Sequence, residues 1–370
     1  MRVEKLPQLE ADFLSSAPDH QLKSFSIPVP GEDNLNLQGQ YVTRNDGFTG
    51  FYEPEKIKKE QIVVHYTIGH VKGDITTLTP AMPRGYPNNK NRLSVAYVIA
   101  RDGTIYQLFH SAYWAFHLGT GAVAGNQTMS QKSIGIELSN FGPLKLSRDG
   151  TTLETVYSQY RDPGTGRQLP VDNYCLLSDE KKYVKVNEPF KDFEYFATFT
   201  QAQYRSLIIL TRYLTAVHEI PRNFLDESVR YQASVQNATF NGIVSHVNHR
   251  ETGKSDIGPA FDWKTFIDGV KAPGFNAQNA DLGTGTLSNA ALSGALAASG
   301  LAAVGVVGLS GSNQIGFQGQ SFTDENEMIT ALEPKTRGIS QRQTTRGLQM
   351  DQEEFMEEAS FDPWRDEMLE

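Results

Sequence analysis

Residues 243–263 read IVSHVNHRETGKSDIGPAFDW, with a histidine at position 246 and an aspartate ten residues later at position 256. Glycine and proline residues inside and just after this segment predict a short loop between the two side chains. Zinc accepts imidazole nitrogen and carboxylate oxygen, and a catalytic zinc needs three protein ligands with one position left open for water. His246 and Asp256 are therefore candidates for two ligands, and a third must come from elsewhere in the chain.

The third ligand is predicted to be His65, which ends an apolar run at residues 59–65. Such a run predicts a buried strand, and the end of a strand is a rigid place for a ligand. Taken alone, His65 fits a core histidine better, but beside the His246–Asp256 loop the ligand interpretation is favoured. His249 is a competing ligand, because it follows His246 in a His-x-x-His arrangement.

Several other segments carry the patterns of regular structure. The turn sequence RDG at 101–103 separates two β-rich runs and predicts a hairpin. Thr200 is an N-cap residue in front of a long segment with an apolar stripe. The predicted elements are strands at 92–100, 104–109 and 133–138, and helices at 200–218 and 262–268.

Composition divides the chain into four parts. Residues 1–56 are polar and rich in turn residues, which predicts an N-terminal extension with little regular structure, packed on a domain at 57–272. Within that domain, residues 141–195 lack periodicity and predict an insertion of loops and short strands. Residues 273–312 form a Gly/Ala-rich linker or hydrophobic segment, and residues 313–370 form an acidic tail.

The formal net charge of −9 argues against nucleic acid as a partner, because phosphate binding requires a basic face. Most of that charge lies in residues 324–370, which contain 13 acidic and five basic residues. The single cysteine, Cys175, excludes an intramolecular disulfide and a cysteine-based zinc site, and it is interpreted as an inert thiol. The first residues contain no apolar run of the signal-peptide type, which predicts a protein without a cleavable signal.

Residues 287–309 are 23 uncharged residues with small side chains at four-residue spacing. This length and spacing fit a membrane span or a helix–helix contact, and the alternative is a flexible low-complexity segment. Together with the acidic tail, the segment is a candidate contact for a membrane or for a secretion or injection apparatus, through residues 287–370.

Five blocks in order carry a resemblance to a known family. They are HYT at 65–67, RDGTIYQ at 101–107, WAFHLG at 114–119, SIGIEL at 133–138, and the His246–Trp263 segment with KSDIGPAFDW at its end. In these blocks the chain resembles the type 2 N-acetylmuramoyl-L-alanine amidases, a family related to the peptidoglycan recognition proteins. The resemblance covers roughly residues 60–270. It implies an α/β fold with a central mixed β-sheet flanked by helices, followed here by the low-complexity C-terminal extension.

The resemblance also implies roles for single residues. His65, His246 and Asp256 fall on the three Zn²⁺ ligands of the family. Glu137 falls on the glutamate that activates the hydrolytic water, and Lys254 falls on the lysine that supports the developing oxyanion.

Four further positions bear on the cleft. His117 falls on a cleft histidine that touches the substrate. Other relatives use a tyrosine near the position of Val95, so that Glu137 is expected to act as the base here. Trp114 and Tyr97 are candidates for stacking on sugar or peptide, although aromatic residues at strand ends are more often part of a core.

These roles fit the chemistry of amide hydrolysis. Zinc lowers the pKa of a bound water toward ~7 and polarises the carbonyl. A carboxylate on a rigid strand can take a proton from water and pass it to the leaving amine. A fixed donor at the oxyanion is typically worth ~3–4 kcal/mol.

The expected function is therefore zinc-dependent hydrolysis of the amide bond between N-acetylmuramic acid and L-alanine in peptidoglycan or muropeptides. The expected setting is a bacterial or phage-infected cytoplasm, with delivery to the wall as a phage-type lysin or as an injected effector or cargo. Two alternatives belong to other classes: a peptidoglycan-binding module that has lost catalysis, and a structural component of a secretion or injection particle.

Overall fold

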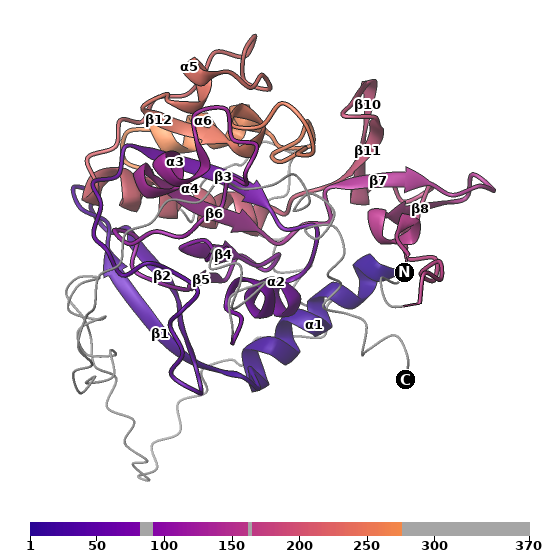
Figure 1. Cartoon of the computed structure of the whole chain (residues 1–370), viewed down its shortest axis with the longest axis horizontal. Helices are drawn as coiled ribbons and strands as arrows, with labels where there is room; N and C mark the ends of the chain where they lie inside the picture. The colour runs from indigo at the N-terminus through magenta and orange to yellow at the C-terminus, as the bar shows by residue number, and fades with distance from the viewer. Residues whose placement is uncertain (82–91, 162–164, 276–370) are drawn as a thin grey trace, which may run out of the picture.

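A seven-stranded mixed sheet forms the centre of the molecule in a computed structural model of the chain (Figure 1). The structure describes residues 1–81, 92–161 and 165–275. Across the sheet the order of strands is β1 (His20–Pro28), β2 (Asn36–Arg44), β5 (Ile105–Gln107), β4 (Tyr97–Ile99), β6 (Ser133–Leu138), β3 (Gln61–Tyr66) and β12 (Gly242–Ser245).

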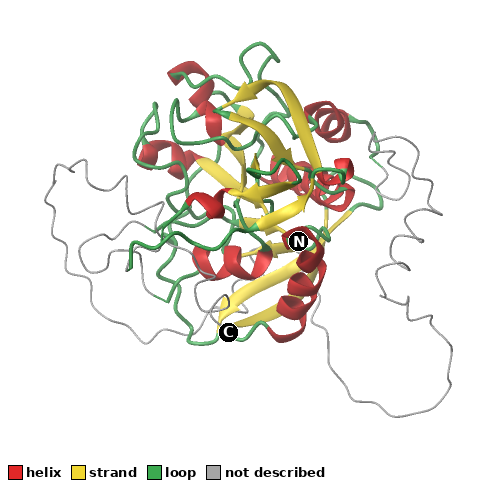
Figure 2. Cartoon of the chain, turned by 90° about the vertical axis from the view of Figure 1, so that its right-hand side faces the viewer, coloured by secondary structure: helices red, strands yellow, loops and turns green. Residues whose placement is uncertain are grey.

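The last four strands in that order, from β4 to β12, are parallel to one another, and β5 pairs with β4 as an antiparallel hairpin. Helices flank the sheet (Figure 2). The predicted α/β fold with a central mixed sheet is thus confirmed, although the strand predicted over 92–100 is regular only at Tyr97–Ile99. The helices are α1 (Arg2–Ser16), α2 (Val71–Leu78), α3 (Asn126–Lys132), α4 (Gln201–Val217), α5 (Val235–Ala238) and α6 (Trp263–Lys271).

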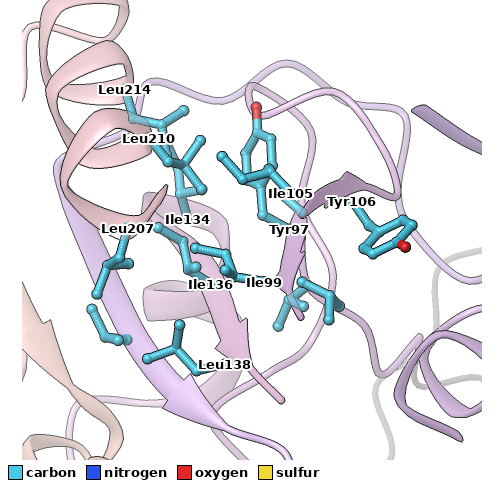
Figure 3. Packing of buried hydrophobic residues seen from close by; sticks show 14 of the residues in the cluster. Tyr97, Ile99, Ile105, Tyr106, Ile134, Ile136, Leu138, Leu207, Leu210 and Leu214 are labelled. Atoms are coloured by element: carbon cyan, nitrogen blue, oxygen red, sulfur yellow. The ribbon is translucent and has the colours of Figure 1, made fainter. Parts of the chain in front are cut away.

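The alternation of side chains along β6 decides which face of the sheet becomes core. Ile134, Ile136 and Leu138 point to one face and pack against the apolar stripe of α4 (Figure 3). The stripe exists because leucines recur at three- and four-residue spacing, at Leu207, Leu210 and Leu214. The other three residues of β6, including Glu137, face the opposite side of the sheet, since successive side chains alternate.

Helix α4 begins where its sequence predicts. The Thr200 hydroxyl accepts a hydrogen bond from the backbone N–H of Gln203, whose side chain in turn accepts from the N–H of Thr200. This reciprocal pair satisfies two of the N–H groups that a helix start leaves without partners.

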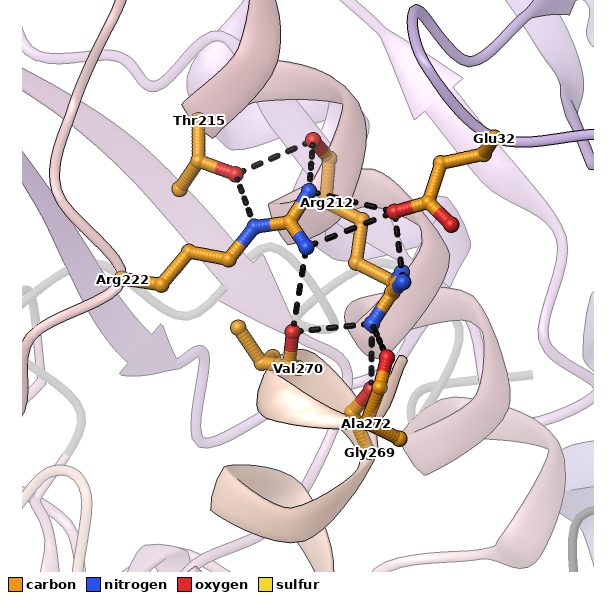
Figure 4. A network of polar contacts seen from close by, with 7 residues as sticks. All are labelled: Glu32, Arg212, Thr215, Arg222, Gly269, Val270 and Ala272. Carbon is orange, nitrogen blue, oxygen red and sulfur yellow. Dashed lines mark hydrogen bonds and ion pairs between the residues drawn. The ribbon is translucent and has the colours of Figure 1, made fainter. Parts of the chain in front are cut away.

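Buried Arg212 joins α4 to the end of α6 (Figure 4). Its Nη1 donates to the backbone carbonyls of Gly269, Val270 and Ala272 at 2.8–3.0 Å, and its Nη2 lies 2.5 Å from a carboxylate oxygen of Glu32. The last carbonyls of a helix have no partner within the helix, so one guanidinium here serves as a cap and as half of a buried ion pair.

The N-terminal extension corrects the expectation of little regular structure, because it contains α1 and the β1–β2 hairpin. Helix α1 contacts two cores at once. Val3 and Leu6 belong to a small cluster with the 141–197 region, whereas Phe13 belongs to the main core. Buried Glu10 lies between them and accepts hydrogen bonds from the backbone N–H groups of Arg101 and Asp102.

The stretch between β6 and α4 forms a second sheet of five strands, seen beside the main sheet in Figure 1. Its strand order is β10 (Tyr183–Phe190), β11 (Phe193–Ala197), β7 (Pro143–Leu146), β8 (Thr152–Thr155) and β9 (Asn173–Leu176), all antiparallel. A short 3-10 helix, η1 (Val156–Gln159), follows β8. Cys175 is buried in the core of this sheet, where burial raises the pKa of its thiol to about 11.

Residues 287–309 and the acidic tail lie outside the described residues. Among the helices that the structure describes, none combines the length and the apolar character needed to cross a membrane.

Candidate active site

Three parallel strands bring the candidate site together at one edge of the sheet. His65 is the penultimate residue of β3, and Glu137 is the penultimate residue of β6. His246 follows β12 directly, at the start of the 3-10 helix η3 (His246–Asn248). Ligands of α/β proteins commonly bind outside the carboxyl ends of parallel strands.

The three predicted ligands lie together and are buried. The Nδ1 atoms of His65 and His246 are 3.0 Å apart. An oxygen of Asp256, Oδ2, lies 3.1 Å from Nδ1 of His65 and 2.9 Å from Nδ1 of His246. These three atoms form a nearly equilateral triangle.

The hydrogen position on His246 follows from its other ring nitrogen. Nε2 lies 3.0 Å from the carbonyl oxygen of Leu118, which can only accept a hydrogen bond. Nε2 therefore carries the hydrogen, and in a neutral imidazole the lone pair is on Nδ1 and points into the triangle.

A longer chain of hydrogen bonds leads to the same result for His65. The Ser133 hydroxyl donates to the carbonyl of Met129 at 2.6 Å, so it must accept from Nε2 of His117, 2.9 Å away. His117 then has its lone pair on Nδ1 and accepts from Nε2 of His65 at 3.0 Å. The lone pair of His65 consequently lies on Nδ1, inside the triangle.

The two histidines of this hydrogen-bonded series, His65 and His117, are held in their neutral form. Burial lowers the pKa of His65 to about 4, and burial with the neighbouring His65 keeps the pKa of His117 well below its usual range. Burial alone would raise the pKa of Asp256, but the adjacent His246 and His65 outweigh it and hold that pKa well below its usual range. The triangle thus brings together two imidazole nitrogens and one carboxylate oxygen, each of which can donate an electron pair to a metal ion.

Three such atoms at this distance repel one another unless a cation lies between them. A tetrahedral zinc with bonds of about 2.0–2.1 Å separates its ligands by about 3.3 Å. The separations of 2.9–3.1 Å are slightly shorter than this, so a small outward movement of the three side chains would give the ion its full bond lengths. The residues therefore fit a zinc ion, with second hydrogen bonds that orient both histidine ligands.

Glu137 stands beside the triangle on the cleft face of β6. Its Oε2 is buried and has no hydrogen-bond partner among the described residues. Burial raises the pKa of Glu137 well above its usual range, the carboxyls of Asp256 and Asp74 raise it further, and Lys254 opposes them. A divalent cation on the triangle would also lower this pKa, since positive charge favours the carboxylate.

A cleft of about 270 Å³ opens over the triangle. Glu137, Lys254, His246 and Asp256 are among its lining residues, and so is Val95, the position at which other relatives were expected to have a tyrosine. A hydrogen bond to β3 fixes the loop that holds Lys254 and Asp256. In this bond the Tyr66 hydroxyl lies 2.5 Å from the Ser255 hydroxyl.

Two of the expected substrate contacts do not fit the structure. Tyr97 is fully buried in the main core beside Ile99 (Figure 3), because β4 is apolar on both faces and this side chain points away from the cleft. Trp114 is also buried, and its indole N–H donates to Glu55 at 3.2 Å. Both aromatic residues therefore have packing roles.

His117 does line the cleft, but both of its ring nitrogens are engaged inside the protein, with His65 and Ser133. In this structure His117 therefore orients the candidate metal ligand His65. The competing ligand His249 lies outside the triangle, and its Nε2 is 3.0 Å from the side-chain oxygen of Gln61.

The cleft also contains residues that the sequence did not indicate. Asp74 on α2 lines it, accepts a 2.5 Å hydrogen bond from Ser139, and has its pKa raised to about 7 by burial. Tyr157 in η1 and Tyr160 directly after it form another part of the lining. Both tyrosines lie in the aperiodic segment 141–195, where no pattern distinguishes them.

A family model described as N-acetylmuramoyl-L-alanine amidase matches residues 55–259. No curated protein matches the chain.

Several solved structures are similar at low identity. One is a selenomethionine derivative of AmpD, 20% identical with a TM-score of 0.35, over 63% of this chain and 94% of that chain. Another is the N-acetylmuramyl-L-alanine amidase AmiD from E. coli, also 20% identical with a TM-score of 0.35, over 59% of each chain. A third is AMPDH3 from Pseudomonas aeruginosa, 17% identical with a TM-score of 0.32, over 58% of this chain and 61% of that chain. The family model spans more than half of the 370 residues, and the chain belongs to the N-acetylmuramoyl-L-alanine amidase family.

Proposed function

We propose that this protein is a zinc-dependent hydrolase that cuts the amide bond between N-acetylmuramic acid and L-alanine in peptidoglycan or muropeptides. The observation that carries the proposal is the convergence of three electron-pair donors, from His65, His246 and Asp256, at the floor of a cleft that also contains Glu137 and Lys254. Membership of the amidase family supports the reaction and the substrate class.

His65, His246 and Asp256 would hold the metal. When bound, zinc lowers the pKa of water and polarises the scissile carbonyl. The carbonyl of Leu118 and the His117–Ser133 pair direct the Nδ1 lone pairs of the two histidines into the triangle, where they would bind the ion.

Glu137 would act as the general base. Its free Oε2 can accept a proton from the attacking water, and the same carboxyl can then donate that proton to the leaving amine of L-alanine. Partial burial suits both steps, because it brings the proton affinity of the carboxylate closer to that of the groups it serves.

Lys254 would stabilise the negative charge that develops on the carbonyl oxygen. It lies in the cleft two residues before the ligand Asp256, in the loop that Tyr66 and Ser255 fix. A positive group held in place before the reaction costs no reorganisation when the charge appears.

The test is to incubate purified sacculi with the protein and to identify the released peptides by mass spectrometry. Peptides with a free L-alanine amino terminus are expected, and a chelator should abolish them until zinc is added back. His246→Ala should lose both bound zinc and activity, whereas His218→Ala, at the end of α4 and outside the cleft lining, should retain both. Absence of such peptides with the zinc-loaded protein, or release that a chelator does not affect, contradicts the proposal.

We further propose that residues 287–370 deliver the enzyme to the wall by contact with a membrane or with a secretion or injection apparatus, as in a phage-type lysin or an injected effector. The support is the 23-residue uncharged segment and the acidic tail that follows it. Fractionation of the full chain after expression in bacteria tests this. Carbonate-resistant membrane association or co-purification with a particle is expected, and recovery only as a soluble monomer contradicts it.

A further inference from the structure

We propose that Tyr157 in η1 and Tyr160 directly after it, in the connection between β8 and β9 of the second sheet, form a subsite for the sugar ring of the substrate. This inference rests on the proposed amidase function. It adds two residues that contact the substrate and assigns them to its sugar rather than to its peptide. Its basis is a pair of aromatic side chains in the wall of the catalytic cleft, supplied by a segment outside the main sheet.

A hydrogen bond joins the pair to the loop that follows β3 and the candidate ligand His65. The Tyr157 hydroxyl donates to the backbone carbonyl of Ile68 at 2.7 Å, three residues after the ligand His65. The Tyr160 ring packs edge-to-face against the Tyr157 ring, with centroids 5.9 Å apart. One tyrosine is therefore fastened to the loop after β3, and the other extends the wall beyond it.

The segment that carries the pair is held firmly in position. The Gln168 side chain donates to the backbone carbonyls of Ser158 and Tyr160, at 2.7 and 2.9 Å. The Thr155 hydroxyl donates to Asp172, which also accepts from Arg2 of α1 at 3.0 Å. The aromatic wall thus exists before a ligand binds, which lowers the entropic cost of binding.

The chemistry of the wall favours sugar over peptide. Tyr160 is 37% exposed, so that part of its flat ring remains open to a ligand. A tyrosine offers an apolar face together with a hydroxyl, which suits a neutral ring with both C–H and O–H groups. The stem peptide, by contrast, carries carboxylates, which are recognised by arginine or lysine. Among the described residues that line the cleft, Lys254 is the only lysine or arginine, and it lies in the loop that also holds the candidate metal ligand Asp256.

Two probes separate the two halves of the substrate. The first is N-acetylmuramic acid converted to its N-methylamide, an uncharged sugar, and the second is the peptide L-alanyl-γ-D-glutamyl-L-lysine. Their binding to the full chain is measured by calorimetry in the presence of a chelator, so that hydrolysis does not consume the sugar. Tyr160→Ala should lower the affinity for the sugar probe by about 5- to 10-fold, because one aromatic contact is lost. The affinity for the peptide probe should stay within about twofold of the parent value. Tyr160→Phe, which keeps the ring, should bind both probes nearly as the parent does.

Leu176→Ala is the matched control, because this residue is exposed on β9 of the same sheet and is not part of the cleft lining. Thermal unfolding checks that all variants remain folded. The inference is overturned if the parent does not bind the sugar probe, if Tyr160→Ala leaves its affinity unchanged, or if the peptide probe alone is weakened. Tyr160-dependent sugar binding by a protein that releases no L-alanine-terminated peptides would uphold the subsite and refute the amidase proposal.

Discussion

His65 and Glu137 are register partners on the adjacent parallel strands β3 and β6. Partners in a sheet direct their side chains to the same face, so a candidate metal ligand and a candidate base stand next to each other by backbone pairing alone. A slip of one residue would turn Glu137 into the core and bring a leucine or isoleucine to the cleft. The alternation of Ile134, Ile136 and Leu138 against α4 prevents this slip.

This pairing predicts that Glu137→Ala separates metal binding from catalysis. Zinc content should stay at the parent level, because the three ligand atoms are untouched, while peptide release from sacculi should fall by about 10²–10⁴-fold. Glu154→Ala on β8 of the second sheet is the control and should leave both quantities unchanged. Parent-level cleavage by Glu137→Ala would remove the general-base role.

The hydrogen-bonded chain from Ser133 through His117 to His65 predicts a remote effect on metal affinity. Ser133→Ala removes the acceptor for Nε2–H of His117, so that the tautomer of His117 and the orientation of His65 are no longer imposed. Zinc affinity should fall by about 10- to 100-fold in a competition assay with a chromogenic chelator. Ser133→Thr retains the hydroxyl and should restore most of the affinity. Equal affinity in Ser133→Ala and the parent would show that the chain does not orient the ligand.

Glu10 predicts a stability effect far from the cleft. Its two carboxylate oxygens accept from the N–H groups of Arg101 and Asp102 at 2.6 and 3.0 Å, in the turn of the β4–β5 hairpin. Glu10→Ala leaves two partly buried donors without this acceptor and should lower the free energy of unfolding by about 1–2 kcal/mol in urea titrations. Glu4→Ala, exposed on the same helix, should change it by less than about 0.5 kcal/mol. A loss of equal size in both variants would mean that the turn contact of Glu10 is not responsible, because alanine is itself a better helix former than glutamate.

The parts of the fold that could be predicted are those with a local signal. Strand β6 has a clear apolar pattern, and α4 has both a stripe and a capping residue, so their bounds were predicted almost to the residue. The spacing to His246 makes Asp256 a candidate ligand, and the resemblance to the amidase family places it above the competing His249.

The parts that could not be predicted depend on tertiary contacts. Helix α1 divides its apolar residues between two cores, Val3 and Leu6 on one side and Phe13 on the other, so its sequence shows no single stripe of the expected kind. Tyr97 lies in a run that is apolar on both faces, and such a run does not show which side chains point to the cleft. The cleft tyrosines lie in an aperiodic segment whose position is set by its packing on α1 and by one bond to Ile68.

Buried Lys59 predicts a pH dependence of stability. The residue is 2% exposed, its Nζ donates to the carbonyl of Gln131 at 2.7 Å, and burial lowers its pKa from 10.5 to about 7. Between pH 7 and 10.5 the unfolded chain therefore holds a proton that the folded chain lacks. Stability from this residue rises with pH across that window, by up to about 1.4 kcal/mol per pH unit, and is level below pH 7.

Lys59→Met should remove this slope, because methionine fills similar space without a charge. At pH 7 the variant should be more stable than the parent by about 1–3 kcal/mol, once the hydrogen bond lost at Gln131 is subtracted from the relief of burying a charge. Urea unfolding at pH 7 and pH 9 measures both effects, with Lys58→Met, an exposed neighbour, as the control that should keep the parent slope. If Lys59→Met and the parent changed equally between the two pH values, Lys59 would have to carry its proton in the folded protein throughout, balanced by a negative group rather than by the carbonyl of Gln131.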